Sequence, residues 1–235
     1  MWRCIAFSAS FRVIFMLEKD ISGSKVNRLP IEFYTRTDVV QIARDLIGKL
    51  LVTEFDGQRT AGVITETEAY RAPDDKACHA YGNRRTARTE VMFHEGGKAY
   101  IYLCYGIHHL FNVVTGTDGV AHAVLIRAIE PLEGQTFMLE RRQALGSKSK
   151  SGNKSQEIKP SLSTGPGALS QALGLHTAYT GQSLLSADSP IWIEDGPQAI
   201  SEDDIVAGKR IGVDYAGECA EWHWRFWLKG SRFHK

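Results

Sequence analysis

The chain has 235 residues, of which 43% are hydrophobic and 23% charged, so it can bury a core as one large domain or two small ones. Its net charge of +1 neither supports nor excludes a nucleic-acid partner, because that depends on where basic residues cluster. No apolar run is long enough to span a membrane, and a reducing, intracellular location is the simpler assumption, because no metal or disulfide spacing relates Cys4, Cys78, Cys104 and Cys219.

The first 30 residues are expected to form a disordered or loosely docked leader. Arg3 and Arg12 interrupt their apolar residues, and no cleavage site of small residues follows. Met16 is a second candidate for the functional start. One domain, at residues 31–235, is expected to follow.

The first helix of this domain is predicted after residue 37. Thr37 or Asp38 can cap it, and apolar residues recur at helical spacing from Val39 to Ile47, with Gly48 near its end. Alternating and β-branched runs then predict strands at residues 50–55 and 60–70 around an Asp56-Gly57 turn, at residues 98–116 around Gly106, and at residues 121–134. These strands and a few helices indicate an α/β arrangement built around an antiparallel sheet.

Two segments are rich in basic residues. Residues 141–159 contain six Lys or Arg and one Glu, and their Gly and Ser content predicts a flexible basic loop at about residues 146–163. A solvated linker and a phosphate-binding loop both fit this composition. A shorter basic patch, which follows His79 directly and is better placed for chemistry, contains Arg84, Arg85 and Arg88.

The second strand of the first hairpin carries two acids. Period-two alternation places Ile64, Glu66, Glu68 and Tyr70 on one face. If that face is solvated, the acids are surface carboxylates, which is the simpler interpretation. If it lines a cleft with Tyr70 and His79, a partly desolvated carboxylate could act as a general base. Spacing alone leaves both interpretations open.

Other chemistry has less support in the sequence. No metal-ligand spacing surrounds His79, and no GxSxG or Walker motif occurs. The aromatic run from Tyr100 to Phe111 predicts a hairpin with one buried set, whereas Tyr105 adjoins the turn, where burial is least expected. A bulky side chain at a hairpin tip, flanked by basic patches, suits a wedge between stacked bases.

Five segments together resemble the 3-methyladenine (alkyladenine) DNA glycosylase family. They are ETEAYRAPDDKACHAYG, TARTEVMFHEGGKAYIYLCYGIHHLFNVVTG, VLIRAIEPLEG, GPGALSQALG and RIGVDYAGE. The match runs in order from about Ala43 to Lys235, and several ungapped blocks make it specific. The resemblance implies a single compact domain of mixed α/β (α+β) class, with a curved antiparallel sheet, surrounding helices and a protruding β-hairpin.

The resemblance also implies a monofunctional DNA-repair enzyme without lyase activity. Such an enzyme extrudes an alkylated or deaminated purine, hydrolyses its N-glycosidic bond and leaves an abasic site. The implied substrates are 3-methyladenine and 7-methylguanine, with hypoxanthine and ethenoadenine as further candidates. The expected partner is damaged double-stranded DNA, bound by a monomer, with no metal or other cofactor and no membrane. The protein is therefore expected to be intracellular and associated with DNA.

Catalytic roles follow from the same resemblance. Glu68 corresponds to the carboxylate that activates the attacking water, with Arg127 beside it and the backbone near Ile211 helping to hold that water. An alkylated purine is cationic and leaves readily, so it needs little acid catalysis. Neutral lesions need a proton donor, for which a backbone amide near His79 and a protonated water are both candidates.

Binding roles are implied for a further set of residues. Tyr70, His79 and Tyr102 match residues that enclose the flipped base, and Asn112 matches a pocket-floor residue that disfavours the amino group of guanine. DNA contacts are implied for Tyr105, which fills the space left by the base, and for Ile107, His108, Thr86, Arg88, Arg84 and Met92.

The sequence departs from the family in places, and other functions stay open. Ala168 stands where relatives commonly have Lys, and further departures near the C-terminus, at Cys219, Trp222, His223 and Arg232, leave local packing and lesion range open. One alternative is a catalytically silent lesion-binding or architectural DNA-binding protein, and another is an RNA-binding or formyltransferase-type accessory domain. Glu68 and Arg127 count against the first, because binding alone requires no water-activating carboxylate.

Overall fold

The computed structural model describes residues 27–144 and 158–235. Most of the predicted leader, residues 1–30, and most of the predicted basic loop, residues 146–163, lie outside the described residues. Among the helices of the two described ranges, none combines the length and the apolar character needed to cross a membrane.

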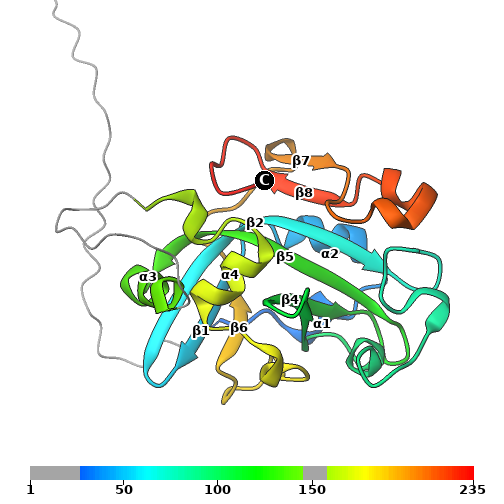
Figure 1. The fold of residues 1–235 in the computed structure, drawn as a ribbon, viewed down its shortest axis with the longest axis horizontal. Coiled ribbons are helices and arrows are strands. Elements are labelled where there is room, and N and C mark those ends of the chain that lie inside the picture. Colours follow the sequence, from blue (N-terminus) through cyan, green and yellow to red (C-terminus); the bar gives the residue numbers. More distant parts are fainter. Residues whose placement is uncertain (1–26, 145–157) are drawn as a thin grey trace, which may run out of the picture.

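One antiparallel sheet of eight strands forms the body of the molecule (Figure 1). Six strands lie in the order β3-β4-β5-β2-β1-β6, while β8 pairs with both β2 and β7. The long strands β2 and β5 curve across the molecule (Figure 1). The predicted single α+β domain around an antiparallel sheet is confirmed. The strands are β1 (Leu50–Phe55), β2 (Gln58–Arg71), β3 (Ala99–Cys104), β4 (His108–Thr115), β5 (His122–Glu133), β6 (Ile191–Glu194), β7 (Ile205–Gly208) and β8 (Arg225–Leu228).

Short helices surround the sheet. The predicted capped helix is α2 (Val39–Asp45), and the Asp38 carboxylate accepts hydrogen bonds from the backbone amides of Val40 and Gln41. The helix ends at Asp45, although the apolar spacing continues to Ile47. The residues after Asp45 form tighter turns with three-residue hydrogen bonds, and Gly48, at φ +86°, then redirects the chain. The other α-helices are α1 (Ile31–Tyr34), α3 (Gln135–Ala144) and α4 (Pro166–Leu173), and 3₁₀ turns occupy Tyr81–Asn83, Glu90–Phe93, Pro160–Leu162, Thr177–Tyr179, Glu202–Asp204 and Asp214–Glu221.

Both predicted hairpins are present, and their turns share one backbone geometry. Between β1 and β2, Asp56 and Gly57 have φ values of +53° and +73°. Between β3 and β4, Tyr105 and Gly106 have φ values of +51° and +73°. A two-residue turn with two consecutive positive φ values matches the twist of the paired strands. Glycine adopts positive φ readily, which explains why the second residue of each turn is a glycine.

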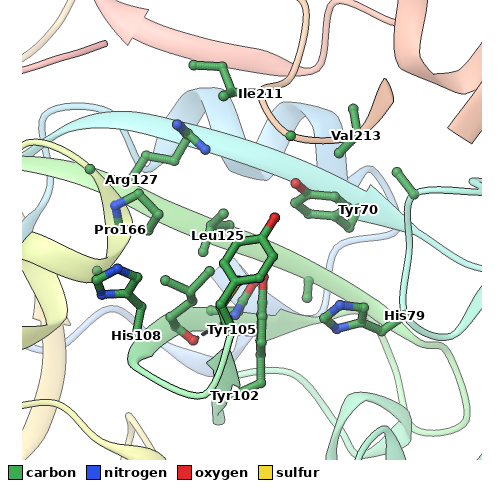
Figure 2. Close-up of a pocket in the computed structure, with 18 of the residues that line it drawn as sticks. Tyr70, His79, Tyr102, Tyr105, His108, Leu125, Arg127, Pro166, Ile211 and Val213 are labelled. Atoms are coloured by element: carbon green, nitrogen blue, oxygen red, sulfur yellow. Dashed lines mark hydrogen bonds between the residues drawn. The ribbon is translucent and has the colours of Figure 1, made fainter. Parts of the chain in front are cut away.

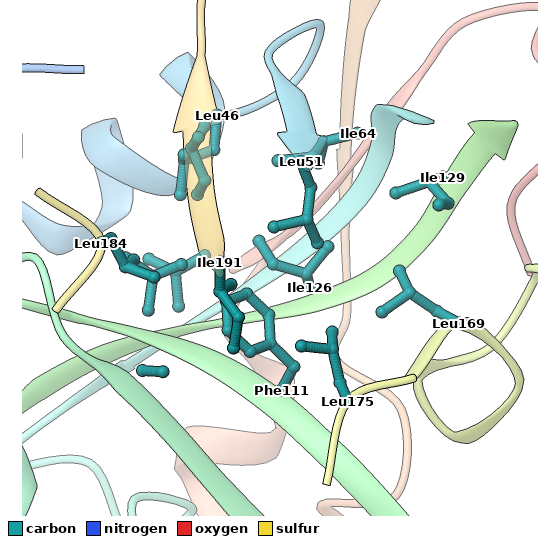
Figure 3. Close-up of a cluster of buried hydrophobic side chains, with 14 of the residues drawn as sticks. Leu46, Leu51, Ile64, Phe111, Ile126, Ile129, Leu169, Leu175, Leu184 and Ile191 are labelled. Carbon is teal, nitrogen blue, oxygen red and sulfur yellow. The ribbon is translucent and has the colours of Figure 1, made fainter. Parts of the chain in front are cut away.

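The main hydrophobic core lies between the sheet and the helices α2 and α4 (Figure 3). Side chains of α2, α4 and the central strands meet there without exposure to solvent. The residues labelled in Figure 3 are Leu46, Leu51, Ile64, Phe111, Ile126, Ile129, Leu169, Leu175, Leu184 and Ile191. Because this cluster fills one face of β4 and β5, their alternate residues, such as Asn112 and Leu125, point to the other face.

The ladder between β2 and β5 contains three register shifts, and two of them lie on either side of Glu66. Ile64 pairs with Ile129, whereas Glu66 pairs with Ala128, so Thr65 is an extra residue on β2. The next shift makes Arg127 an extra residue on β5. The prediction that Ile64 shares a face with Glu66, Glu68 and Tyr70 is therefore wrong. Ile64 packs in the main core, because the bulge breaks the alternation.

Candidate active site

A cavity of about 430 Å³ opens on the face of the sheet opposite the main core (Figure 2). Its walls come from β2, the segment between β2 and β3, the β3–β4 hairpin, β5, the start of α4 and the segment after β7. Sequence-predicted site residues that line it are Tyr70, His79, Met92, Tyr102, Tyr105, His108, Asn112, Arg127 and Ile211. The sheet thus gathers residues that are up to 141 positions apart in the chain.

Glu68 lies directly behind this lining and is 0% exposed. Its Oε1 accepts a hydrogen bond of 2.7 Å from the backbone amide of Ile211. Its Oε2 accepts one of 2.8 Å from the Tyr70 hydroxyl and lies 3.2 Å from Nη1 of Arg127. Burial raises the pKa of Glu68 above its usual value, while Arg127, Ile211 and Tyr70 act against that rise. The interpretation of Glu68 as a surface carboxylate is therefore wrong.

Arg127 stands between two buried carboxylates. Its Nε donates a hydrogen bond of 2.9 Å to Oε1 of Glu66, and its Nη1 faces Glu68. Burial lowers the pKa of Arg127, but the charges of Glu68 and Glu66 outweigh burial, so that the pKa is raised. Glu66, for which no role is predicted from the sequence, is thus part of the same network. Its only sequence signal was its spacing of two residues from Glu68.

Aromatic side chains enclose the cavity. Tyr70 lies across the opening from His79 and Tyr102 (Figure 2). The rings of His79 and Tyr102 meet edge to face, with centroids 4.6 Å apart. A planar group that entered between these walls would find π-surfaces and little water.

The Tyr70 ring is supported from outside the cavity by a buried cation. The guanidinium carbon of Arg210 lies 4.9 Å from the Tyr70 ring centre and 5.3 Å from that of Trp224. Two hydrogen bonds, of 2.5 and 2.8 Å, join this guanidinium to the buried carboxylate of Asp75. Sequence reasoning missed this pair, because 135 residues separate its members.

His79 is a neutral imidazole in this setting. Burial and the nearby charge of Arg88 lower its pKa to about 4. Nη2 of Arg88 lies 2.9 Å from Nε2 and 3.3 Å from Nδ1 of His79, and Nδ1 lies 2.8 Å from the Tyr100 hydroxyl. A guanidinium only donates, so Arg88 favours an imidazole with an acceptor nitrogen, which is the neutral form.

Asn112 and Met92 are both buried residues of the lining. The side-chain amide of Asn112 donates to the carbonyl oxygens of Tyr100 and Leu110, at 3.1 Å each, which fixes its orientation. Met92 is 1% exposed, so any contact it makes with a ligand would lie inside the cavity and not on the open surface.

The tip of the β3–β4 hairpin carries exposed apolar side chains at the mouth of the cavity. Tyr105 is 91% exposed and Ile107 is also exposed. His108 faces the start of α4, where Gly167 leaves room for its ring: a Cβ at that position would come within 3.0 Å of it. The apolar side chains at the hairpin tip are therefore exposed to solvent, whereas His108, which follows them, contacts the start of α4.

The basic patch after His79 is only partly available to a ligand. Arg84 is exposed, whereas Arg85 pairs with Glu90 at 2.8 Å. Arg88 lies over the Tyr102 ring at 5.0 Å in addition to its contact with His79. The Thr86 hydroxyl is 3.1 Å from that of Thr89 and helps to order this turn.

The departures from the family pattern fall on two sides of the site. Ala168 lines the cavity at the start of α4. Cys219 is buried and packs with Val213 behind the wall, and Trp222 packs against Trp224 with ring centroids 4.4 Å apart and ring planes tilted by 46°. Within the described part of the chain, no three His, Cys, Asp or Glu side chains are grouped so as to hold a metal ion.

Comparisons with known proteins agree on one family. A family model described as methylpurine-DNA glycosylase (MPG) matches residues 32–232. A Chlamydia felis protein, provisionally named a 3-methyladenine DNA glycosylase, is 46% identical over 207 residues, which cover 88% of this chain and 99% of the relative. Relatives with the same provisional name come from Bacillus subtilis (44% identity, covering 88% of this chain and 96% of the relative) and Desulfitobacterium hafniense (42%, 88% and 98%).

Proposed function

The chain belongs to the methylpurine-DNA glycosylase family, and on that premise we propose that it excises alkylated and deaminated purines from DNA with a water activated by Glu68. The substrates in this proposal are 3-methyladenine, 7-methylguanine, hypoxanthine and ethenoadenine. The product is an abasic site, and no lyase step follows.

One observation carries the proposal: Glu68 is a buried carboxylate held by three donors immediately behind an aromatic cavity. As the glycosidic bond breaks, the sugar approaches an oxocarbenium ion, which an anionic Glu68 stabilises. The same carboxylate takes a proton from the attacking water. A positioned general base contributes about 10²–10⁴ in rate.

The aromatic walls suit the leaving group of this reaction. Alkylation at N3 or N7 makes a purine cationic, and cations bind well over the faces of tyrosine rings. Tyr70, Tyr102 and the neutral His79 supply such walls without adding a positive charge of their own inside the pocket. Asn112 is the candidate that excludes the amino group of guanine.

DNA binding is assigned to the rim. Tyr105 would enter the duplex and occupy the space of the extruded nucleotide, a process that costs a few kcal/mol and is least costly at damaged bases. Arg84 and Arg88 would contact phosphates and make binding weaken as salt rises. One lesion offers no two-fold symmetry, so a monomer is expected to act.

A panel of duplexes, each with one of the four lesions, tests the proposal. We expect released base and an abasic site for at least one lesion in the presence of a chelator, and no release from undamaged DNA. Release from none of them would refute glycosylase activity, and saturable binding of intact lesion DNA would then favour a silent lesion-binding protein. Borohydride trapping of a protein–DNA adduct would contradict the absence of a lyase step.

A further inference from the structure

Glu66 is a fully buried carboxylate to which the proposed reaction assigns no role. It is 0% exposed and has three donors. Nε of Arg127 and Nη1 of Arg225 lie 2.9 and 3.1 Å from its Oε1, and the backbone amide of Lys235 lies 3.1 Å from its Oε2. A charge removed from water is retained only with such compensation, so Glu66 is built into its site.

The Arg127 guanidinium has one end on Glu66 and the other on Glu68. Its Nε donates to Glu66, and its Nη1 lies 3.2 Å from Oε2 of Glu68. A guanidinium is planar and rigid, so a hydrogen bond at Nε fixes the direction of Nη1. Arg127 is the extra residue of a bulge, where the ladder with β2 constrains its backbone less than a regular pair would.

Glu66 also joins three strands at one point. β8 pairs with β2 at residues 66–68, and Arg225 from β8 reaches the same carboxylate oxygen as Arg127 from β5. Arg225 in turn donates to the Lys235 carbonyl oxygen at 2.8 Å. Loss of this carboxylate would leave two guanidinium groups without their shared partner.

We infer that Glu66 is a positioning residue for the proposed excision reaction. It holds the Arg127 guanidinium so that Nη1 remains in contact with Glu68, and it binds Arg225 of β8 and the backbone amide of Lys235 at the same carboxylate. The inference rests on the proposed function, because its effect is exerted through Glu68. Glu66 is not itself part of the cavity lining and reaches it only through Arg127 and Lys235, so its role is indirect.

Glu66 further sets the charge that Glu68 experiences. Burial is the main cause of the raised pKa of Glu68, and the negative charge of Glu66 adds to it, while Arg127 opposes it. Other charged or titratable groups that act on this network are Arg225 from β8, Arg210 after β7, Tyr70 from β2 and Tyr102 from β3. A neutral residue at position 66 that still accepts the hydrogen bond from Nε of Arg127 removes this repulsion and leaves Arg127 on Glu68, so the pKa of Glu68 falls.

Two substitutions separate the charge of Glu66 from its geometry. Glu66→Gln keeps the shape and an acceptor oxygen but removes the charge, whereas Glu66→Asp keeps the charge and withdraws the acceptor by one methylene. The measurement is single-turnover excision of 7-methylguanine from a duplex between pH 5 and 8, with spontaneous release subtracted. This cationic base needs little acid catalysis, so the loss of rate at low pH reports protonation of Glu68. Glu54→Gln, on the exposed end of β1, is the matched control.

For Glu66→Gln we expect the low-pH midpoint of the rate profile to move to lower pH, with a several-fold lower plateau rate. For Glu66→Asp we expect a plateau about tenfold lower with the midpoint near that of the wild type. A merely structural Glu66 would lower stability and leave the midpoint in place.

An unmoved midpoint in Glu66→Gln, or a full plateau rate in Glu66→Asp, would overturn the inference. If Glu66→Gln does not fold, the plateau of Glu66→Asp still decides the positioning role. The wild-type rate in the same experiment separates the two claims: an active wild type with an unmoved midpoint in Glu66→Gln overturns only the role of Glu66, whereas absent excision by the wild type refutes the proposed function and with it that role.

Discussion

The backbone amide of Ile211 and Oε1 of Glu68 are 2.7 Å apart, although 143 residues separate them in the chain. Together with Tyr70 and Arg127, this amide orients the Glu68 carboxylate before any ligand arrives. Fixed donors of this kind need no reorganisation during the reaction, which is the main source of electrostatic catalysis.

Replacement of Glu68 by glutamine should abolish most excision and preserve binding. The amide has nearly the same shape but no basic oxygen, so we expect single-turnover excision to fall by about 10²–10⁴. Lesion binding in a gel-shift assay should stay within a few-fold of wild type. An active Glu68→Gln enzyme would contradict the assignment of the general base.

Replacement of Arg127 by methionine should move the pH profile upward. Arg127 lowers the pKa of Glu68, so its loss raises that pKa, and excision of 7-methylguanine should then decline at a higher pH than in the wild type. Removal of one partner of a buried ion pair costs about 3–5 kcal/mol of unfolding free energy, which chemical denaturation would measure. A profile that moves to lower pH would contradict this charge arrangement.

The imidazole of His79 should titrate far below an ordinary histidine. Its pKa is lowered to about 4, first by burial and then by Arg88, so the ring stays neutral through the range in which the enzyme would act. Nitrogen chemical shifts recorded by NMR during an acid titration measure this pKa. In Arg88→Gln the midpoint should rise without reaching 6.5, because burial remains. A wild-type midpoint near 6.5 would show that His79 is solvated.

Tyr105 offers a test in which stability and excision change independently. Its side chain is 91% exposed, and its φ of +51° is a conformation that glycine adopts freely. Tyr105→Gly should therefore keep or raise the unfolding free energy, by about 0–1 kcal/mol. Excision should fall about tenfold, because stacking of one base on an aromatic ring contributes about 1–3 kcal/mol. Full activity of this variant would refute the proposed insertion of Tyr105 into the duplex.

The buried pair of Asp75 and Arg210 should matter far more to stability than an exposed pair nearby. Asp75→Asn leaves an unpaired buried guanidinium against Tyr70, so a loss of about 3–5 kcal/mol in unfolding free energy is expected. Glu218→Gln, which breaks the exposed pair with Lys76, should change the unfolding free energy much less, because solvent screens an exposed pair. Denaturant titrations of the two variants give the comparison, and equal effects would refute it.

Local features of the fold were readily predicted from the sequence. The Asp38 cap, the Asp56-Gly57 turn and the hairpin around Gly106 each depend on a few adjacent residues, and the structure contains all three. The burial of Glu66 and Glu68 was not predicted, because it depends on bulges between β2 and β5 and on β8, which pairs from far along the chain.

The candidate site shows the same division. Alternation placed Glu68 and Tyr70 on one face, and their hydrogen bond agrees with it. Only the family resemblance connected them with Ile211, because no local pattern joins a strand to a loop 143 residues later. The support of Tyr70 by Arg210 had no local signal at all.

The late position of β8 in the chain has a consequence for protein synthesis. β2 and β5 leave the ribosome well before Ile205–Lys235, so for a time Glu66 and Glu68 lack the partners that the later segment supplies: the Arg225 guanidinium and the amides of Ile211 and Lys235. A nascent chain without that segment would keep both carboxylates hydrated and poorly oriented. Competence for the proposed base excision would then arise only when the last strand has joined the sheet.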